Sequence, residues 1–166
     1  MGAMDDRLTA FGNQLIDSHI RLRELLSSLR DGTYSGIDLR THCLAFCAVL
    51  TAHHEAEDDG AFPVLGKHYP ELRPVLDELR RDHRLVGEVL DRLKDASTME
   101  ERELDTLAAL LETHLVYEEK KLVAALNGLR VTGEEGRPWL ALPGLGKPDP
   151  WLNAGLAGSG LKIGGE

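Results

Sequence analysis

The residues with the clearest capacity for chemistry form two His-x-x-x-Glu pairs. In each pair a histidine precedes a glutamate by four positions, which places both side chains on one face of a helix. A further histidine precedes each pair at a similar distance along the chain. The six residues are His19, His53, Glu57, His83, His114 and Glu118. Imidazoles mixed with carboxylates suit iron, with manganese or zinc as weaker candidates.

Four stripes of apolar residues carry these histidines. Their members recur every three or four positions, the spacing of the buried face of an amphipathic helix. The stripes are Leu8-Phe11-Leu15-His19-Leu22-Leu26-Leu29, Leu39-Cys43-Phe46-Leu50-His53-Glu57, Leu76-Leu79-His83-Val86-Leu90-Leu93 and Leu107-Leu111-His114-Glu118-Leu122-Ala125. Four helices are therefore expected to turn one imidazole each into a common core.

The two glutamates make the strongest case for metal. An ionised carboxylate buried without a partner is destabilised by several kcal/mol or more. No Lys or Arg lies in the stripes near Glu57 or Glu118 to neutralise them. Metal cations would neutralise both carboxylates and use the imidazole lone pairs. Because the His and His-x-x-x-Glu pattern occurs twice, we expect two ions, with Glu57 and Glu118 bridging them.

The elements that must position these residues are four helices, expected over about 5–29, 35–59, 70–95 and 97–127. Gly60 and Pro63 are expected to end the second helix, followed by a connector over 62–69. Pro70 suits the first turn of the third helix, and Gly128 suits a C-terminal cap. Short connections favour antiparallel neighbours. The predicted fold class is all-α, an up-down antiparallel four-helix bundle over residues 5–127.

Residues 128–166 differ in composition from the bundle. Glycine and proline are dense here, yet both tryptophans, Trp139 and Trp151, lie in this segment among several leucines. A purely disordered tail rarely carries such apolar side chains. We expect a partly ordered C-terminal extension that packs on the bundle, with a role in covering the core site or docking a partner as the alternative.

Composition narrows the class of partner. The formal net charge is −9 and the sequence pI is near 5.2, which disfavours nucleic acid or an anionic membrane. No apolar run approaches the roughly 20 residues of a membrane-spanning helix, and no secretory leader is visible, so we expect a cytoplasmic location. Cys43 and Cys47, four apart in a helical pattern, are expected to be reduced core residues.

The residue pattern resembles the hemerythrin-like, or HHE cation-binding, family over about residues 5–127. The resemblance lies in His19, His53-His54-Glu55-Ala56-Glu57-Asp58, Phe62-Pro63, His83 and His114-Leu115-Val116-Tyr117-Glu118-Glu119. It implies a four-helix bundle around an oxo- or hydroxo-bridged di-iron centre that binds O2. His19 and His53 would bind one iron, His83 and His114 the other, and the two glutamates would bridge. The two Glu-x-x-His motifs of ferritin-like sites and the His-Glu-x-x-His motif of zinc proteases are absent.

One departure from the family pattern affects function. Oxygen-carrying members place a second histidine four residues after the ligand of the third helix, and here that position is Gly87. Both irons would then keep open positions for water, O2, peroxide or NO. We therefore expect a redox or oxygen-activating di-iron protein with an electron donor, possessing oxidase or peroxide-handling activity, rather than a simple O2 carrier. The alternative is a sensor or storage module for O2, redox state or iron that does not turn over. Glu88 is an alternative ligand, or else a surface carboxylate.

Residues beside the predicted ligands leave further alternatives open. His54 and Asp58 are expected to flank the site and support its ligands, with direct ligation as the alternative. Tyr117 could act in catalysis by donating to a bound oxygen species, or could simply pack on the helix flank. We expect His42 and His68 at the surface, and we assign no orienting role to Asp17 or Asp82, which precede the ligand histidines.

Overall fold

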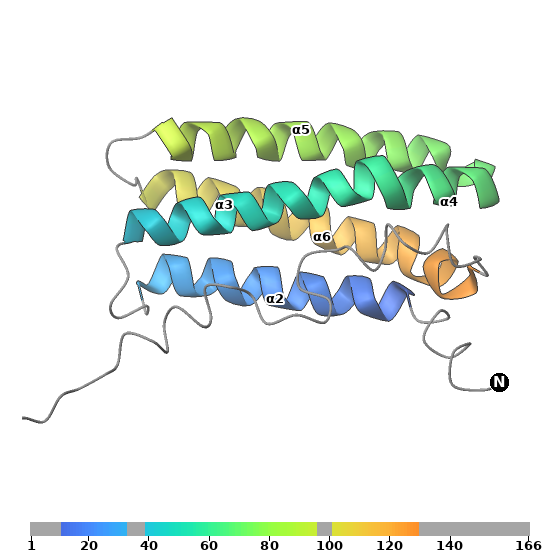
Figure 1. The fold of residues 1–166 in the computed structure, drawn as a ribbon, viewed down its shortest axis with the longest axis horizontal. Helices are drawn as coiled ribbons and strands as arrows, with labels where there is room; N and C mark the ends of the chain where they lie inside the picture. The colour runs from blue at the N-terminus through green and yellow to red at the C-terminus, as the bar shows by residue number, and fades with distance from the viewer. Residues whose placement is uncertain (1–10, 33–38, 96–100, 130–166) are drawn as a thin grey trace, which may run out of the picture.

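The computed structural model describes residues 11–32, 39–95 and 101–129, and these residues form helices without any strand. The four long helices are α2 (Phe11–Asp31), α3 (Leu39–Ala56), α5 (Arg73–Asp95) and α6 (Glu101–Gly128). Successive helices run in opposite directions (Figure 1). This confirms the predicted all-α, up-down four-helix bundle. The expected helix starts over 5–10, 35–38 and 97–100 and the extension over 130–166 lie outside the described residues.

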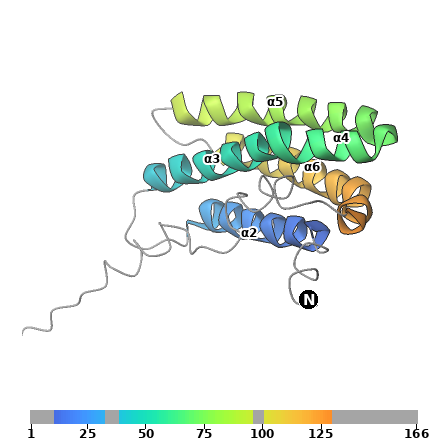
Figure 2. The ribbon, with the colours of Figure 1, turned by 45° about the vertical axis from the view of Figure 1, so that its right-hand side comes forward.

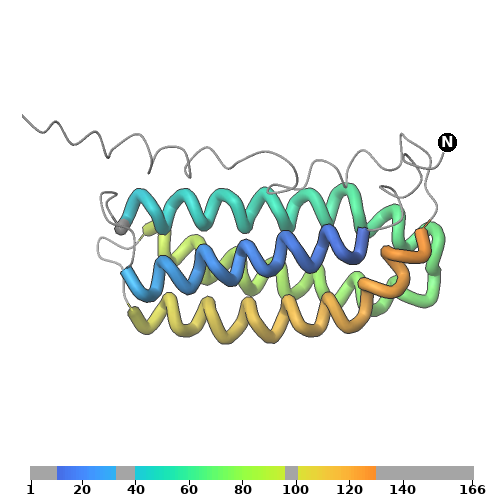
Figure 3. Tube along the Cα trace, turned by 90° about the horizontal axis from the view of Figure 1, so that it is seen from below, coloured from blue at the N-terminus to red at the C-terminus, as the bar shows by residue number. Residues whose placement is uncertain are grey.

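Each long helix packs against two others. α2 contacts α3 and α6, and α5 contacts α3 and α6. In the view of Figure 3, α2 lies between α3 and α6. Four apolar faces therefore meet along one axis, which is what the four stripes predict. No helix in the described ranges combines the length and the apolar character that crossing a membrane requires.

The predicted end of the second helix at Gly60 is wrong. The chain continues through a π-helical turn, η1 (Glu57–Ala61), into α4 (Phe62–His68), and α4 extends the line of α3 (Figure 2). The Phe62 N–H donates to the carbonyl of Glu57, five residues earlier. Pro63 then falls in the first turn of α4, where a missing N–H does least harm. The expected connector over 62–69 is therefore largely helical.

The reversal of the chain occurs at Tyr69. Its φ and ψ of −130° and 76° are not helical, as expected for a residue that precedes proline. A short 3₁₀ turn, η2 (Pro70–Leu72), then leads into α5. Pro70 thus begins the turn before the third long helix, one step earlier than predicted.

Two glycines behave differently at helix ends. Gly32 has a φ of +62° directly after α2, the left-handed conformation that ends many helices. Gly128 was predicted to be such a cap, and this prediction is wrong. It is the last residue of α6, and its φ is not positive. A Cβ there would lie 3.0 Å from the Tyr69 hydroxyl, so Gly128 allows this hydroxyl to approach.

The core consists of two apolar clusters separated by a polar layer. The first includes Leu22, Leu50, Val86 and Leu111, and the second includes Leu15, Leu79 and Leu122. Along α2, α5 and α6 the predicted ligand histidine lies between a member of one cluster and a member of the other, and after His53 of α3 the second cluster begins at Ala61 of η1. The predicted site therefore occupies the middle of the bundle, with apolar side chains on both sides.

Cys43 and Cys47 are buried and free, as predicted. His68 is exposed, also as predicted, but His42 is buried, which corrects its expected surface position.

Candidate metal centre

The structure brings all six predicted ligands into one buried layer. His19 comes from α2, His53 from α3, Glu57 from the start of η1, His83 from α5, and both His114 and Glu118 from α6. Each side chain is at most 6% exposed. Because one ligand histidine lies in each apolar stripe, the packing that forms the core also gathers the imidazoles.

Three contacts define the centre of the layer. His53 Nε2 lies 2.6 Å from Glu57 Oε1, and His114 Nε2 lies 3.2 Å from Glu118 Oε2. His19 Nε2 lies 3.7 Å from the same Glu118 oxygen. Glu118 thus faces histidines of both halves of the sequence repeat, the placement expected of a bridging carboxylate.

The irregular turn coincides with a ligand. η1 begins at Glu57, so the regular α-helical hydrogen bonding of α3 changes at the residue that carries the carboxylate. π-helical turns inside α-helices are frequent at functional sites. Glu57 still lies one helical step after His53, and the change in hydrogen bonding affects the residues that follow it.

Among the described residues, the basic side chains that contact the two glutamates are all histidines. Within the described residues, none of their four carboxylate oxygens receives a well-aligned hydrogen bond, and their ion-pair contacts are with imidazoles alone. Burial raises the pKa of Glu57 to about 7 and also raises the pKa of Glu118. The nearby charge of Glu57 raises the pKa of Glu118 further. Such a pair is held ionised only by added positive charge.

Burial acts on the imidazoles in the opposite direction, because it lowers the pKa of a histidine. Burial lowers the pKa of His19 to about 3 and that of His53 to about 4, so both rings are neutral near pH 7. Burial also acts against protonation of His114, but its hydrogen bond to Glu118 and the charges of Glu118 and Glu57 raise its pKa to about 9. Neutral imidazole is the form that binds metal.

Carboxylates outside the layer fix two of the rings. His19 Nδ1 lies 2.9 Å from Glu119 Oε1, and His83 Nδ1 lies 2.8 Å from Asp58 Oδ1. Each of these carboxylates directly follows the glutamate of the opposite half of the repeat. Because Nδ1 donates outward, Nε2 is left to face the layer. Ligand histidines of metal sites are commonly held in this way.

Asp82 also supports the layer, which corrects the prediction that it has no orienting role. Its Oδ2 lies 3.3 Å from His114 Nδ1. Adjacent positions of one helix face different directions, so Asp82 does not point toward His83. Its side chain instead contacts His114 on the neighbouring helix, α6. Asp17 is exposed.

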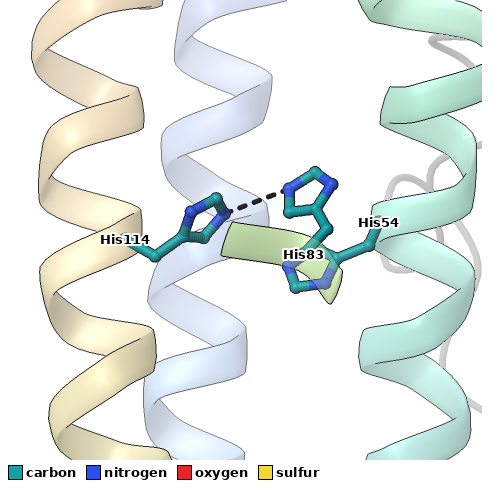
Figure 4. A group of neighbouring side chains, drawn as sticks. All are labelled: His54, His83 and His114. Atoms are coloured by element: carbon teal, nitrogen blue, oxygen red, sulfur yellow. Dashed lines mark hydrogen bonds between the residues drawn. The ribbon is translucent and has the colours of Figure 1, made fainter. Parts of the chain in front are cut away.

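His54 is buried in the site rather than only at its flank. It is 6% exposed, and its ring stacks on that of His83 with centroids 3.9 Å apart and planes within 10°. Figure 4 shows both rings beside His114, with the His83 Nε2 to His114 Nε2 contact of 3.1 Å. A second stripe of buried residues on the same helix consists of Cys43, Cys47, Leu50 and His54. This spacing is the sequence signal that could have identified His54 as a buried residue.

Within the part of the chain that the structure describes, three groups of candidate ligand atoms lie close enough to hold an ion, each with its atoms within 4.8 Å of one another. They are His54 with His83 and His114, His19 with His53 and Glu57, and Glu57 with His83 and Glu118. Glu57 belongs to two groups, which suits two neighbouring ion positions. The residues therefore fit a pair of cations that share carboxylates.

The remaining candidates lie apart from this layer. The Tyr117 hydroxyl donates to Glu78 Oε2 at 2.6 Å in an exposed position, and the Tyr117 ring packs against the second apolar cluster. This arrangement agrees with the alternative of a flank-packing residue. Glu88 is exposed, as expected of a surface carboxylate.

A buried layer of imidazoles and carboxylates in a four-helix bundle is the arrangement of a metal-binding bundle protein. Residues 12–126 match the family model described as the hemerythrin HHE cation binding domain. Because this match spans most of the chain, the chain belongs to that family, whose domain binds metal cations. The comparisons with curated proteins and with solved structures found no match.

Proposed function

We propose that the polar layer holds two iron ions as a non-haem di-iron centre that binds and reduces O2, peroxide or NO. His19 and His53 would bind one ion, His83 and His114 the other, and Glu57 and Glu118 would bridge them. The family match, the shared position of Glu57 and the imidazole–carboxylate donor set support this assignment. Manganese and zinc are the weaker alternatives.

The observation that carries the proposal is the burial of two carboxylates without a matching cation. Glu57 is 1% exposed and Glu118 is fully buried. Removing an ionised carboxylate from water costs several kcal/mol even after relaxation. His114, whose pKa is raised to about 9, supplies one positive charge near pH 7, whereas His19 and His53 are neutral and supply none. Two metal cations would neutralise both carboxylates.

Bound iron supplies a Lewis acid and a source of electrons for small oxygen species. The two apolar clusters of the chain exclude water from the layer. His19 and His83 donate their Nδ1 protons in hydrogen bonds to Glu119 and Asp58, respectively. At Gly87 no side chain is available to complete the coordination. The open position favours redox turnover with an external electron donor over reversible O2 carriage.

Metal analysis of the purified protein tests this proposal. We expect about two irons per chain, together with the absorption bands of an oxo-bridged pair. His83→Gln should lower the iron content, whereas His68→Gln, a change at an exposed histidine, should not. Zinc alone, or no metal after anaerobic reconstitution, would contradict the proposal.

Rapid mixing of the reduced protein with O2 or peroxide separates catalysis from the alternative function. Repeated turnover supports an oxidase or peroxide-handling activity. A stable adduct without turnover supports a sensor or storage module.

A further inference from the structure

The two halves of the metal layer are closed to different degrees. Four residues after His19 lies Arg23, whose guanidinium contacts Glu119 at 2.8 Å and Glu112 at 2.9 Å. This ion-pair network covers the His19 side between α2 and α6. Four residues after His83 lies Gly87, which has no side chain to do the same. The repeat is thus symmetric in its ligands but not in its outer cover.

A cavity lies at the uncovered side. It has a volume of about 150 Å³ and lies between α3 and α5, where its lining includes Thr51, His54, Asp58, His83 and Gly87. A Cβ added at Gly87 would meet nothing within 4 Å. The cavity therefore reaches the rings of His54 and His83, and the space beside position 87 is free.

His54 lies between this cavity and the polar layer. Its Nε2 is buried and has no hydrogen-bond partner among the described residues, although its ring is 6% exposed. The corresponding residue after His114 is Leu115, which is fully buried in the first apolar cluster. The repeat position of His54 thus carries a leucine on α6, and the extra imidazole lies beside His83, on which it stacks.

The size of the cavity limits what it can admit. A water molecule takes about 30 Å³ in the liquid, so the space suits a few water-sized groups. Sites for drug-sized organic ligands range from roughly 300 to 1,000 Å³. A two- or three-atom molecule fits within it.

We infer that the cavity beside Gly87 is the access and binding position for a small polar ligand of the size of peroxide or azide, which reaches the metal layer from the His83 side and hydrogen-bonds to His54. This inference rests on the proposed di-iron function and adds to it the side of approach and the class of ligand. In this arrangement His54 is a ligand-binding residue, and His19, His53, His83 and His114 hold the metal.

Azide titration of the iron-loaded protein, followed by its absorption spectrum, tests the inference. Gly87→Leu should fill the cavity, and His54→Gln should change its polar group. We expect each variant to bind azide at least about tenfold more weakly or more slowly, with the iron content of the wild-type protein. Gly87→Ala should have a smaller effect. Glu88→Leu introduces the same side chain at the adjacent exposed position and should leave azide binding unchanged.

The outcomes separate the inference from the proposed function. If the wild-type protein binds no metal, both are overturned. If it binds iron but Gly87→Leu takes up azide like the wild type, the cavity is not the route, and only the inference fails. Loss of iron from His54→Gln would make His54 a metal ligand and overturn its assigned role.

Discussion

Replacing Glu57 by glutamine should have opposite effects on the metal-free and the metal-loaded protein. Burial raises the pKa of Glu57 from its ordinary value of 4.5 to about 7. A carboxyl group with a raised pKa keeps its proton longer in the folded chain than in the unfolded chain. Ionisation of Glu57 therefore lowers the free energy of unfolding of the metal-free protein progressively as the pH rises from about 4.5 to about 7.

The size of the effect follows from this shift. Each pKa unit corresponds to about 1.4 kcal/mol, so ionised Glu57 lowers the free energy of unfolding by roughly 3 kcal/mol above pH 7. Glu57→Gln keeps the shape and removes the charge. At about pH 8 the metal-free variant should be more stable than the wild type by up to about 3 kcal/mol, and at about pH 4 the difference should vanish.

With metal present the order should reverse. A ligand at a thousand times its Kd stabilises the folded state by about 4 kcal/mol, and the variant should lose much of that gain because it lacks a bridging carboxylate. Urea unfolding followed by circular dichroism, with chelator and with anaerobic ferrous iron, measures both differences. Glu88→Gln is the control, since exposed substitutions stay within about 0.5 kcal/mol. A variant less stable than the wild type in chelator at pH 8 would refute the reasoning.

Three further predictions concern residues that surround the polar layer. Gly12→Ala should lower stability by about 1–3 kcal/mol, because its Cβ would lie 2.5 Å from the Val123 carbonyl oxygen. Thermal melts should show no such loss for Gly87→Ala, where that space is empty and alanine favours the helix by up to about 1 kcal/mol. Glu119→Gln, which weakens the support of His19, should lower iron affinity about 10- to 100-fold in a chelator competition; unchanged affinity would argue against that support. Tyr117→Phe should leave the iron content and the turnover rate unchanged, since its hydroxyl bonds to Glu78, and a loss of turnover with full iron content would restore its catalytic role.

The fold and the gathering of the six candidate residues in one buried layer could be predicted because both depend on one periodicity. A histidine in each apolar stripe must enter the core that the stripes form, whatever the detailed packing. His114 and Glu118 on one stripe, for example, reach the layer together. The same logic applied to the stripe that ends at His54 would have placed this residue inside as well.

The outer contacts could not be predicted because they depend on how neighbouring helices are rotated. Asp82 faces His114 across α5 and α6, a relation between helices that spacing within one helix does not contain. The continuation past Gly60 was missed for a different reason. Glycine and proline usually end helices, but the π-helical turn from Glu57 shifts the hydrogen bonds so that Pro63 falls in a first turn.

Anaerobic titration of the metal-free protein with ferrous iron tests the central claim most directly. The claim is that cations hold Glu57 and Glu118 inside the bundle. The wild-type chain should bind two equivalents, and the double variant Glu57→Gln, Glu118→Gln should bind none with comparable affinity. Equal binding by the double variant, or no binding by the wild type, would contradict it.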